Sequence, residues 1–121
     1  MSAAEGYQAI RRSRLVAILG ASSPDRLVAG AQVLVEEGIQ TLELPLTSPD
    51  ALDAIRRTAE LAGGRALVGA GTIRTVDDAR RAVDAGAVAL GVGSPLSGEA
   101  LEYGDVDQLR KRTRSWKAAV S

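Results

Sequence analysis

The sequence predicts an α/β fold of four consecutive βα units with parallel strands, which is half of a (β/α)8 barrel. Short apolar runs alternate with segments of helical periodicity, and glycines at 38, 63 and 86 separate each predicted helix from the next strand. A helical crossover makes consecutive strands parallel. Because a complete barrel takes about 250 residues, the 121 residues are the right length for half of one. A small open four-stranded α/β sheet is the competing architecture.

The first unit begins with the apolar run LVAIL at 15–19, which suits a strand buried on both faces. Ser23-Pro24-Asp25 follows as a helix start, because serine caps a helix, proline fits its first turn and aspartate complements its dipole. Gly38 ends this helix. A short opening helix is expected over residues 3–12, before the first strand.

The second and third units repeat this pattern. The run QTLELPL at 40–46 is the second predicted strand, and Ser48-Pro49-Asp50 repeats the helix start almost letter for letter. The run ALVGA at 66–70 is the third predicted strand. Thr75 with Asp78 three residues later resembles a capping box, with aspartate in place of glutamate.

The fourth unit consists of the apolar run VALGV at 88–92, a loop rich in glycine, serine and proline, and a final helix over 105–119. Apolar residues at helical spacing support that helix. The chain has no low-complexity tract and no obvious linker. Residues 1–121 are therefore predicted to form a single domain.

The composition excludes several classes of function. Lys and Arg together number 15, as do Asp and Glu, so the net charge of zero gives no electrostatic reason to expect a nucleic acid or a membrane as partner. The absence of Cys and His excludes disulfides, thiol nucleophiles, His/Cys zinc sites and Ser-His-Asp catalysis. No apolar run is long enough to span a bilayer and the amino terminus has no signal pattern, so we expect a cytoplasmic protein.

Glu43 is the strongest candidate for a functional side chain. Along the predicted second strand, Glu43 points to the face opposite that of Leu42 and Leu44. A carboxylate inside a covered sheet is either paired or part of a site, because an unpaired buried carboxylate is costly. Arg14 is the partner that a structural role would need. The other alternative makes Glu43 a catalytic residue.

Three further features lie where strands end, which is where parallel α/β folds bind ligands. Gly69-Ala70-Gly71-Thr72 lets a ligand approach the backbone and offers a hydroxyl, although a tight turn explains it equally well. Gly91-Val92-Gly93-Ser94 offers amides for a phosphate, or forms a plain turn. Thr47-Ser48-Pro49 precedes a helix, where simple capping is the alternative to a ligand site.

The two lysines of the chain, Lys111 and Lys117, lie in the final predicted helix beside several arginines. Such a run of charge is usually a solvated helix face, so neither lysine is expected to be catalytic. Too few carboxylates lie near Glu43 in the sequence for a divalent metal. No metal and no cofactor are expected.

Four stretches of the chain resemble the KDPG/KHG aldolase family, the class I aldolases that cleave 2-keto-3-deoxy-6-phosphogluconate and 4-hydroxy-2-oxoglutarate. These stretches are LVAIL, AGAQVLVEEGIQTLELPLTSPDALDAI, ALVGAGTI and AVDAGAVALGVGSPL. From Arg14 to Ala87 the order and spacing are similar to the family's first three βα units. The remainder resembles the family's last strand, its phosphate-binding glycine loop and its closing helix.

The resemblance implies that Glu43 is a general acid/base, which moves protons between the family's nucleophilic lysine, water and substrate. It implies that Gly71 and Thr72 contact the substrate. Thr47, which we also assign to the substrate site, stands where the family usually carries an arginine for the substrate carboxylate.

The resemblance also implies that Gly91, Gly93 and Ser94 bind a phosphate. The family's Schiff-base lysine has no counterpart in this chain, because the middle-to-late units of the family's barrel have no match. A class I aldolase needs that amine as its electron sink. We therefore expect impaired or no class I aldolase activity.

Two functions from different classes remain open. The first is a lyase related to the enzymes that cleave 2-keto-3-deoxy-6-phosphogluconate to pyruvate and glyceraldehyde 3-phosphate, and its ligand would be a phosphorylated keto acid. The alternative is a non-catalytic half barrel that binds a sugar phosphate or another anion, or that has only a structural role in an oligomer.

A half barrel leaves two strand edges open and exposes the inward face of each strand. At about 25 cal/mol per Å², a few hundred Å² of exposed apolar surface costs several kcal/mol. This is comparable with the stability of a whole domain. The sequence therefore predicts a homodimer or a higher oligomer that completes the ring.

Overall fold

The computed structural model describes residues 2–121, and its centre is a parallel sheet with the strand order β1-β2-β3. The strands are β1 (Ala17–Ile18), β2 (Thr41–Pro45) and β3 (Leu67–Gly71). Ile18 is paired with Glu43, and Glu43 with Gly69. Because all three strands run in the same direction, their carboxyl ends lie together at one end of the sheet.

The fourth predicted strand, 88–92, lies beside β3 in parallel orientation but forms only an isolated bridge, between Ala70 and Leu90. The Gly91 N–H donates to the Ala70 carbonyl at 2.8 Å, whereas the Val88 N–H donates to the Val68 carbonyl at 2.9 Å. The pairing therefore shifts by one residue between 88 and 90. This irregular register explains why the segment is not a regular strand.

Seven helices are assigned among the described residues. They are α1 (Ala3–Ser13), α2 (Pro24–Glu36), α3 (Ala51–Ala62), α4 (Val76–Asp84), α5 (Ser94–Ser97), α6 (Ala100–Tyr103) and α7 (Val106–Val120). The predicted helices are present, and α5 and α6 replace most of the predicted loop before the final helix. In the described part of the chain, every helix is too short or too polar to cross a bilayer.

Two of the three predicted helix starts are confirmed in detail. The Ser23 hydroxyl accepts the Arg26 N–H at 3.3 Å, and the Thr75 hydroxyl accepts the Asp78 N–H at 3.0 Å. The third prediction is wrong, because α3 is capped at Asp50, which has a left-handed φ of 51° and makes no side-chain cap bond. The Ser48 hydroxyl instead accepts the backbone N–H of Ala21 at 3.4 Å.

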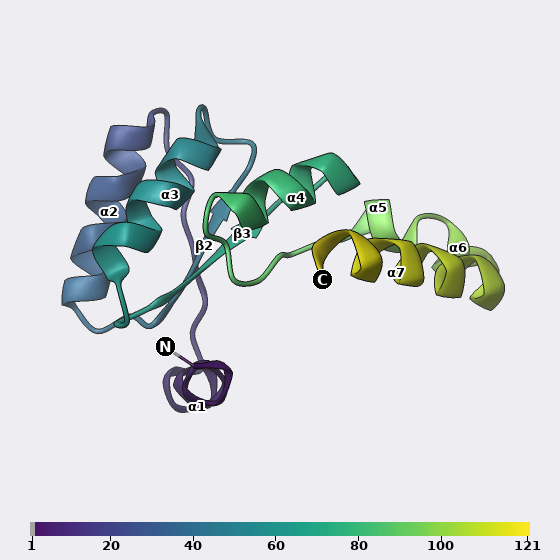
Figure 1. The fold of residues 1–121 in the computed structure, drawn as a ribbon, viewed down its shortest axis with the longest axis horizontal. Coiled ribbons are helices and arrows are strands. Elements are labelled where there is room, and N and C mark those ends of the chain that lie inside the picture. The colour runs from purple at the N-terminus through teal and green to yellow at the C-terminus, as the bar shows by residue number, and fades with distance from the viewer. Residues whose placement is uncertain (1) are drawn as a thin grey trace.

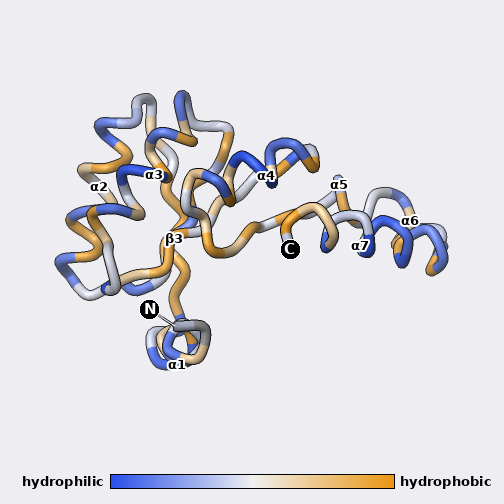
Figure 2. The backbone as a smooth tube through the Cα atoms, in the orientation of Figure 1, coloured by the Kyte–Doolittle hydropathy of each residue, from blue (hydrophilic) through white to orange (hydrophobic). Residues whose placement is uncertain are grey.

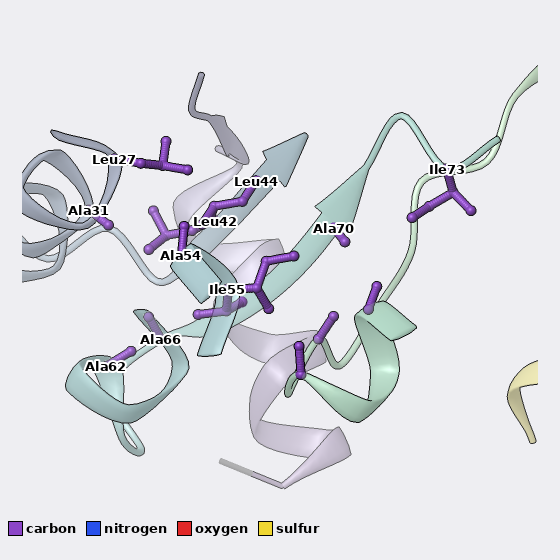
Figure 3. Packing of buried hydrophobic residues seen from close by; sticks show 14 of the residues in the cluster. Leu27, Ala31, Leu42, Leu44, Ala54, Ile55, Ala62, Ala66, Ala70 and Ile73 are labelled. Carbon is purple, nitrogen blue, oxygen red and sulfur yellow. The ribbon is translucent and has the colours of Figure 1, made fainter. Parts of the chain in front are cut away.

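The core lies on the face of the sheet that α2 and α3 cover (Figure 1). Leu44 from β2 and Ile55 from α3 are fully buried, and Ile73 closes the core after β3. Figure 3 shows these side chains together with small alanines from α2 and α3. Alanines let the helices approach the sheet closely, so a core without phenylalanine still packs.

The carboxyl-terminal helices form an arm that extends away from the sheet (Figure 1). No residue of α7 is buried, and Figure 2 shows hydrophilic residues along much of this helix. The arm is held by contacts of α7 with α4, α5 and α6, and Trp116 packs against the edge of the core. The sheet with α2, α3 and α4 is called the body below, and α5, α6 and α7 are called the arm.

Candidate functional site

The Glu43 side chain projects from β2 on the face of the sheet opposite the helical core. Its neighbours Leu42 and Leu44 are buried in that core, while Glu43 is half-buried. This alternation follows from the pleat of the strand. Its partners in the register, Ile18 and Gly69, lie on the same face as Glu43. This face corresponds to the inside of the predicted barrel.

Two glycines make room for the carboxylate of Glu43. A Cβ atom on Gly71 would overlap with Oε1 of Glu43, and a Cβ atom on Gly91 would lie 3.1 Å from the same oxygen. Neither glycine has a positive φ, so the requirement is for space and not for an unusual backbone conformation. Gly71 and Gly91 are far apart in the sequence, yet both leave space for the Glu43 carboxylate. This space beside the two glycines is called the carboxylate seat, or seat, below.

The first glycine of the Gly-Ala-Gly-Thr stretch has a different task. A Cβ atom on Gly69 would lie 3.0 Å from the carbonyl oxygen of Ala89. Gly69 therefore allows the 88–92 segment to lie close beside β3. The two glycines of this stretch thus serve separate purposes, one in chain packing and one at the carboxylate.

The carboxylate of Glu43 forms no ion pair within residues 2–121. The alternative in which Arg14 neutralises it is not supported, because no ion pair joins Arg14 and Glu43. Arg14 caps the end of α1 in a left-handed conformation with φ 57°. The ion pairs of the described chain lie on helix exteriors, such as that of Arg57 with Asp25 at 2.8 Å. That hydrogen bond raises the pKa of Arg57 above its ordinary value.

Thr72 has a left-handed φ of 53°. This conformation is unusual for a β-branched residue and stores strain of order 1–3 kcal/mol. Such strain is often found at active sites and ligand-binding sites, where the surrounding structure holds the backbone in the unfavourable conformation. Thr72 directly follows Gly71, so the strained residue lies one position beyond the seat of Glu43.

The structure divides the predicted site residues between two cavities. Thr47 and Thr72 line a cavity of about 520 Å³ between the loops that follow β2 and β3. Glu43 and Gly91 line a second, largely apolar cavity of about 200 Å³ on the inner face of the sheet. Glu43 does not line the larger cavity.

Arg74 and Arg81, which are not among the predicted site residues, line the larger cavity with Thr47 and Thr72. Arg81 is paired with Asp77 at 2.9 Å, whereas Arg74 forms no ion pair within residues 2–121. The signal in the sequence was the position of Arg74 two residues after Thr72, in the loop that leaves a strand end. Guanidinium groups bind carboxylates strongly, and the carboxylates of Asp50, Asp53 and Asp78 line the same cavity as Arg74.

The predicted phosphate loop is only partly joined to this region. The Gly91 N–H is already engaged with the Ala70 carbonyl at 2.8 Å. Gly93 and Ser94 are exposed at the start of α5 and line neither of the two cavities above. A Cβ atom on Gly93 would have no atom within 4 Å, so the backbone there is open to an incoming group.

Neither lysine lies in the cavity of Glu43. Lys117 lines a different cavity, of about 320 Å³, together with Trp116, and Lys111 is exposed on α7. The expectation that both belong to a charged helix face is consistent with the exposure of both side chains.

The fold and this site define a class of protein: a parallel half barrel with a carboxylate seated at the inner face near its strand ends. Within this class the comparisons identify one family. Residues 7–106 match the family described as KDPG and KHG aldolase, and the chain belongs to that family. The prediction of an α/β half barrel related to these aldolases is thereby confirmed.

Individual relatives agree with this assignment. A probable 2-dehydro-3-deoxy-6-phosphogalactonate aldolase of Rhizobium meliloti is 35% identical over 72 residues, which are 60% of this chain and 34% of that protein. The 2-dehydro-3-deoxy-6-phosphogalactonate aldolase of Escherichia coli is 36% identical over 59 residues, which are 49% of this chain and 29% of that protein. The matches thus span about a third of the length of these curated relatives.

A solved structure shows the same fold. The 2-keto-3-deoxy-6-phosphogluconate aldolase of Zymomonas mobilis, crystallised with 3-phosphoglycerate, superposes with a TM-score of 0.54 at 29% identity. The superposition covers 74% of this chain and 43% of that one. The similarity therefore extends over most of the present chain and less than half of the solved enzyme.

Proposed function

We propose that this chain is an aldolase-type half barrel that binds a phosphorylated 2-keto acid, with Glu43 as its proton-transfer group. The observation that carries the proposal is the space that Gly71 and Gly91 leave for the Glu43 carboxylate on the inner face, where it forms no ion pair within residues 2–121. A carboxylate that lines a cavity and has no ion-pair partner within residues 2–121 is suited to accept a proton from a bound substrate.

The remaining site residues would bind the ligand. In this proposal the hydroxyls of Thr47 and Thr72 contact the end of the keto acid that is farther from Glu43, since both line the cavity beyond the strand ends. Arg74 lines that cavity together with the carboxylates of Asp50, Asp53 and Asp78. The exposed amides of Gly93 and Ser94 bind the phosphate. Gly91 contributes room for Glu43, because its own N–H is bonded to Ala70.

In this proposal the described chain does not form a Schiff base. A class I aldolase requires an amine close to the substrate carbonyl, and both lysines lie on α7, outside the cavity that contains Glu43. Proton exchange at a bound keto acid passes through its enol: Glu43 would take the methyl proton while a water molecule protonates the carbonyl oxygen, and the reverse step returns a solvent proton. This exchange uses no group of α7. The proposed activity is therefore ligand binding with proton transfer, without class I cleavage of the carbon–carbon bond.

A second candidate function is purely structural. The cavity of Glu43 is lined mainly by apolar side chains, among them Ile10, Val16 and Leu67. Val16 and Ile18 are 52% and 67% exposed. These apolar groups support association of the chain with further copies of itself, as the sequence predicts. We place both candidate functions in the cytoplasm.

Ligand binding is tested by NMR titration of the whole chain with pyruvate and, separately, with inorganic phosphate. We expect pyruvate to shift amides near Glu43, Thr47 and Thr72, and phosphate to shift amides near Gly93 and Ser94. Glu43→Gln keeps the shape of the side chain and removes its charge, so exchange of the pyruvate methyl protons with D₂O should be lost while binding is retained. Shifts confined to α7 would contradict the proposal.

A further inference from the structure

The sheet has two unpaired edges with free backbone groups. The Leu19 N–H donates to the Glu43 carbonyl at 2.9 Å, so the N–H and C=O of Ile18 point away from β2. At the other edge the Ala70 N–H donates to the Ala89 carbonyl at 3.0 Å. The N–H and C=O of Leu90 therefore point away from β3, and they form no hydrogen bond within residues 2–121.

An apolar groove follows the second edge. It is the cavity of about 320 Å³ lined by Val83, Val88, Leu90, Val92, Trp116 and Val120, between α4 and the end of α7. Val88 is 63% exposed although it lies beside the core. Free backbone groups next to an apolar groove are the features that an added strand uses, because it gains hydrogen bonds and buried area together.

The charges of the chain are unevenly distributed. α7 has five cationic side chains and one anionic one, which gives a net charge of +4. The whole chain has 15 residues of each sign, so the rest of it has a net charge of −4. α2 ends in the exposed pair Glu36 and Glu37, which form no ion pair among the described residues. Val33, one turn earlier on α2, is 55% exposed.

The acidic end of α2 and Lys117 of α7 both lie toward the amino ends of the strands. α2 ends just before β2 begins, so Glu36 and Glu37 lie near the amino ends of the strands. Lys117 lines the groove with Val88, and the Val88 N–H donates to the Val68 carbonyl near the amino end of β3. Figure 1 shows the carboxyl terminus beside the segment that follows α4. A second sheet added in parallel would bring its α2 beside this α7.

We propose that a second copy of the chain closes the ring, with its β1 paired in parallel with residues 88–92 and its α2 packed against α7. The acidic end of that α2 then faces Lys117. A two-fold axis repeats the same contact at the other pair of edges, so both free edges are used. This geometry specifies the self-association proposed above, and it encloses the inner face on which Glu43 lies.

The proposal is tested by size-exclusion chromatography with light scattering on the whole chain. We expect a dimer at micromolar concentration. Val88→Lys places a charge in the groove and should give a monomer, while Val106→Lys, at a position 58% exposed on the outer end of the arm, should leave the dimer intact. Circular dichroism of each variant checks that the chain is folded.

Charge reversal tests the geometry separately from association. Lys117→Glu should raise the dimer Kd about tenfold, because the two-fold axis makes each change act twice. Glu36→Lys combined with Glu37→Lys should do the same, and the triple variant should recover most of the lost affinity. A dimer whose Kd does not respond to these changes would contradict the packing of α2 against α7 but not self-association. A monomeric wild-type chain would contradict both the packing and self-association.

Discussion

Helices α3 and α7 are similar in length but differ completely in burial. α3 has 12 residues and buries five of them, whereas α7 has 15 residues and buries none. Both show apolar residues at helical spacing. The comparison teaches that periodicity identifies a helix but does not say whether a partner covers its apolar face.

The difference reflects what each helix packs against. α3 lies between α2 and the sheet, where Ala54 and Ile55 are fully buried. α7 contacts the short helices α5 and α6 and the edge of α4, and its Trp116 is only partly buried. Most of the folding free energy is therefore expected to come from the body, because hydrophobic stabilisation follows the buried apolar area.

The largest expected effect is in the body. Ile55→Ala removes a fully buried side chain and should lower the free energy of unfolding by about 2–5 kcal/mol. Val106→Ala, at an exposed position of α7, is the matched control and should change it by less than about 0.5 kcal/mol. Urea denaturation followed by circular dichroism measures both. Equal effects would remove the distinction between body and arm.

A smaller effect is expected where the arm meets the body. Trp116→Ala should cost about 1–2 kcal/mol, less than a fully buried tryptophan, because part of its surface already contacts water. Hydrogen exchange should show faster exchange in α7 and unchanged exchange in β2. Loss of protection in β2 as well would mean that the arm and the body unfold as one unit.

A stabilising change is expected inside α3. The hydroxyl of Thr58 is buried and has no hydrogen-bond partner within the described residues. Thr58→Val keeps the shape and removes this unsatisfied group, so it should raise the free energy of unfolding by about 1 kcal/mol. The transition midpoint in urea measures the change. Destabilisation would show that the hydroxyl has a partner, such as a buried water.

The smallest effect on stability is expected at the site. Gly71→Ala places a methyl group where Oε1 of Glu43 lies, and the flexible side chain can move away. Stability should fall by less than about 1 kcal/mol, while the exchange of pyruvate protons should be lost. Gly30→Ala, in α2 at a position with no neighbouring atom within 4 Å, should leave that exchange unchanged. An active Gly71→Ala variant would refute the role of the seat.

Most of the fold could be predicted from local patterns. The strand predicted over 40–46 is observed as Thr41–Pro45, and that predicted over 66–70 is observed as Leu67–Gly71. The run 15–19 is reduced to Ala17–Ile18, because an edge strand pairs on one side only. The one-residue shift at 88–92 depends on how that segment packs over Gly69, which no local pattern contains.

The site could be predicted in its parts but not in its arrangement. Glu43 was identified by its charge within an apolar run, and Gly71 and Gly91 by their places at strand ends. That both glycines accommodate the same carboxylate follows only from the register of the strands. The separation of Thr72 and Glu43 into two cavities likewise depends on the backbone turn at Thr72, directly after β3, and on the face of β2 from which Glu43 projects.

The central claim is that the Glu43 carboxylate acts in this chain without an amine beside it. It is tested most directly by incubating the protein with pyruvate and sodium borohydride, followed by intact-mass and peptide mass spectrometry. The account predicts an unmodified mass. A reduced pyruvate adduct on Lys111 or Lys117 would contradict it, because it would place one of these α7 amines at the substrate carbonyl.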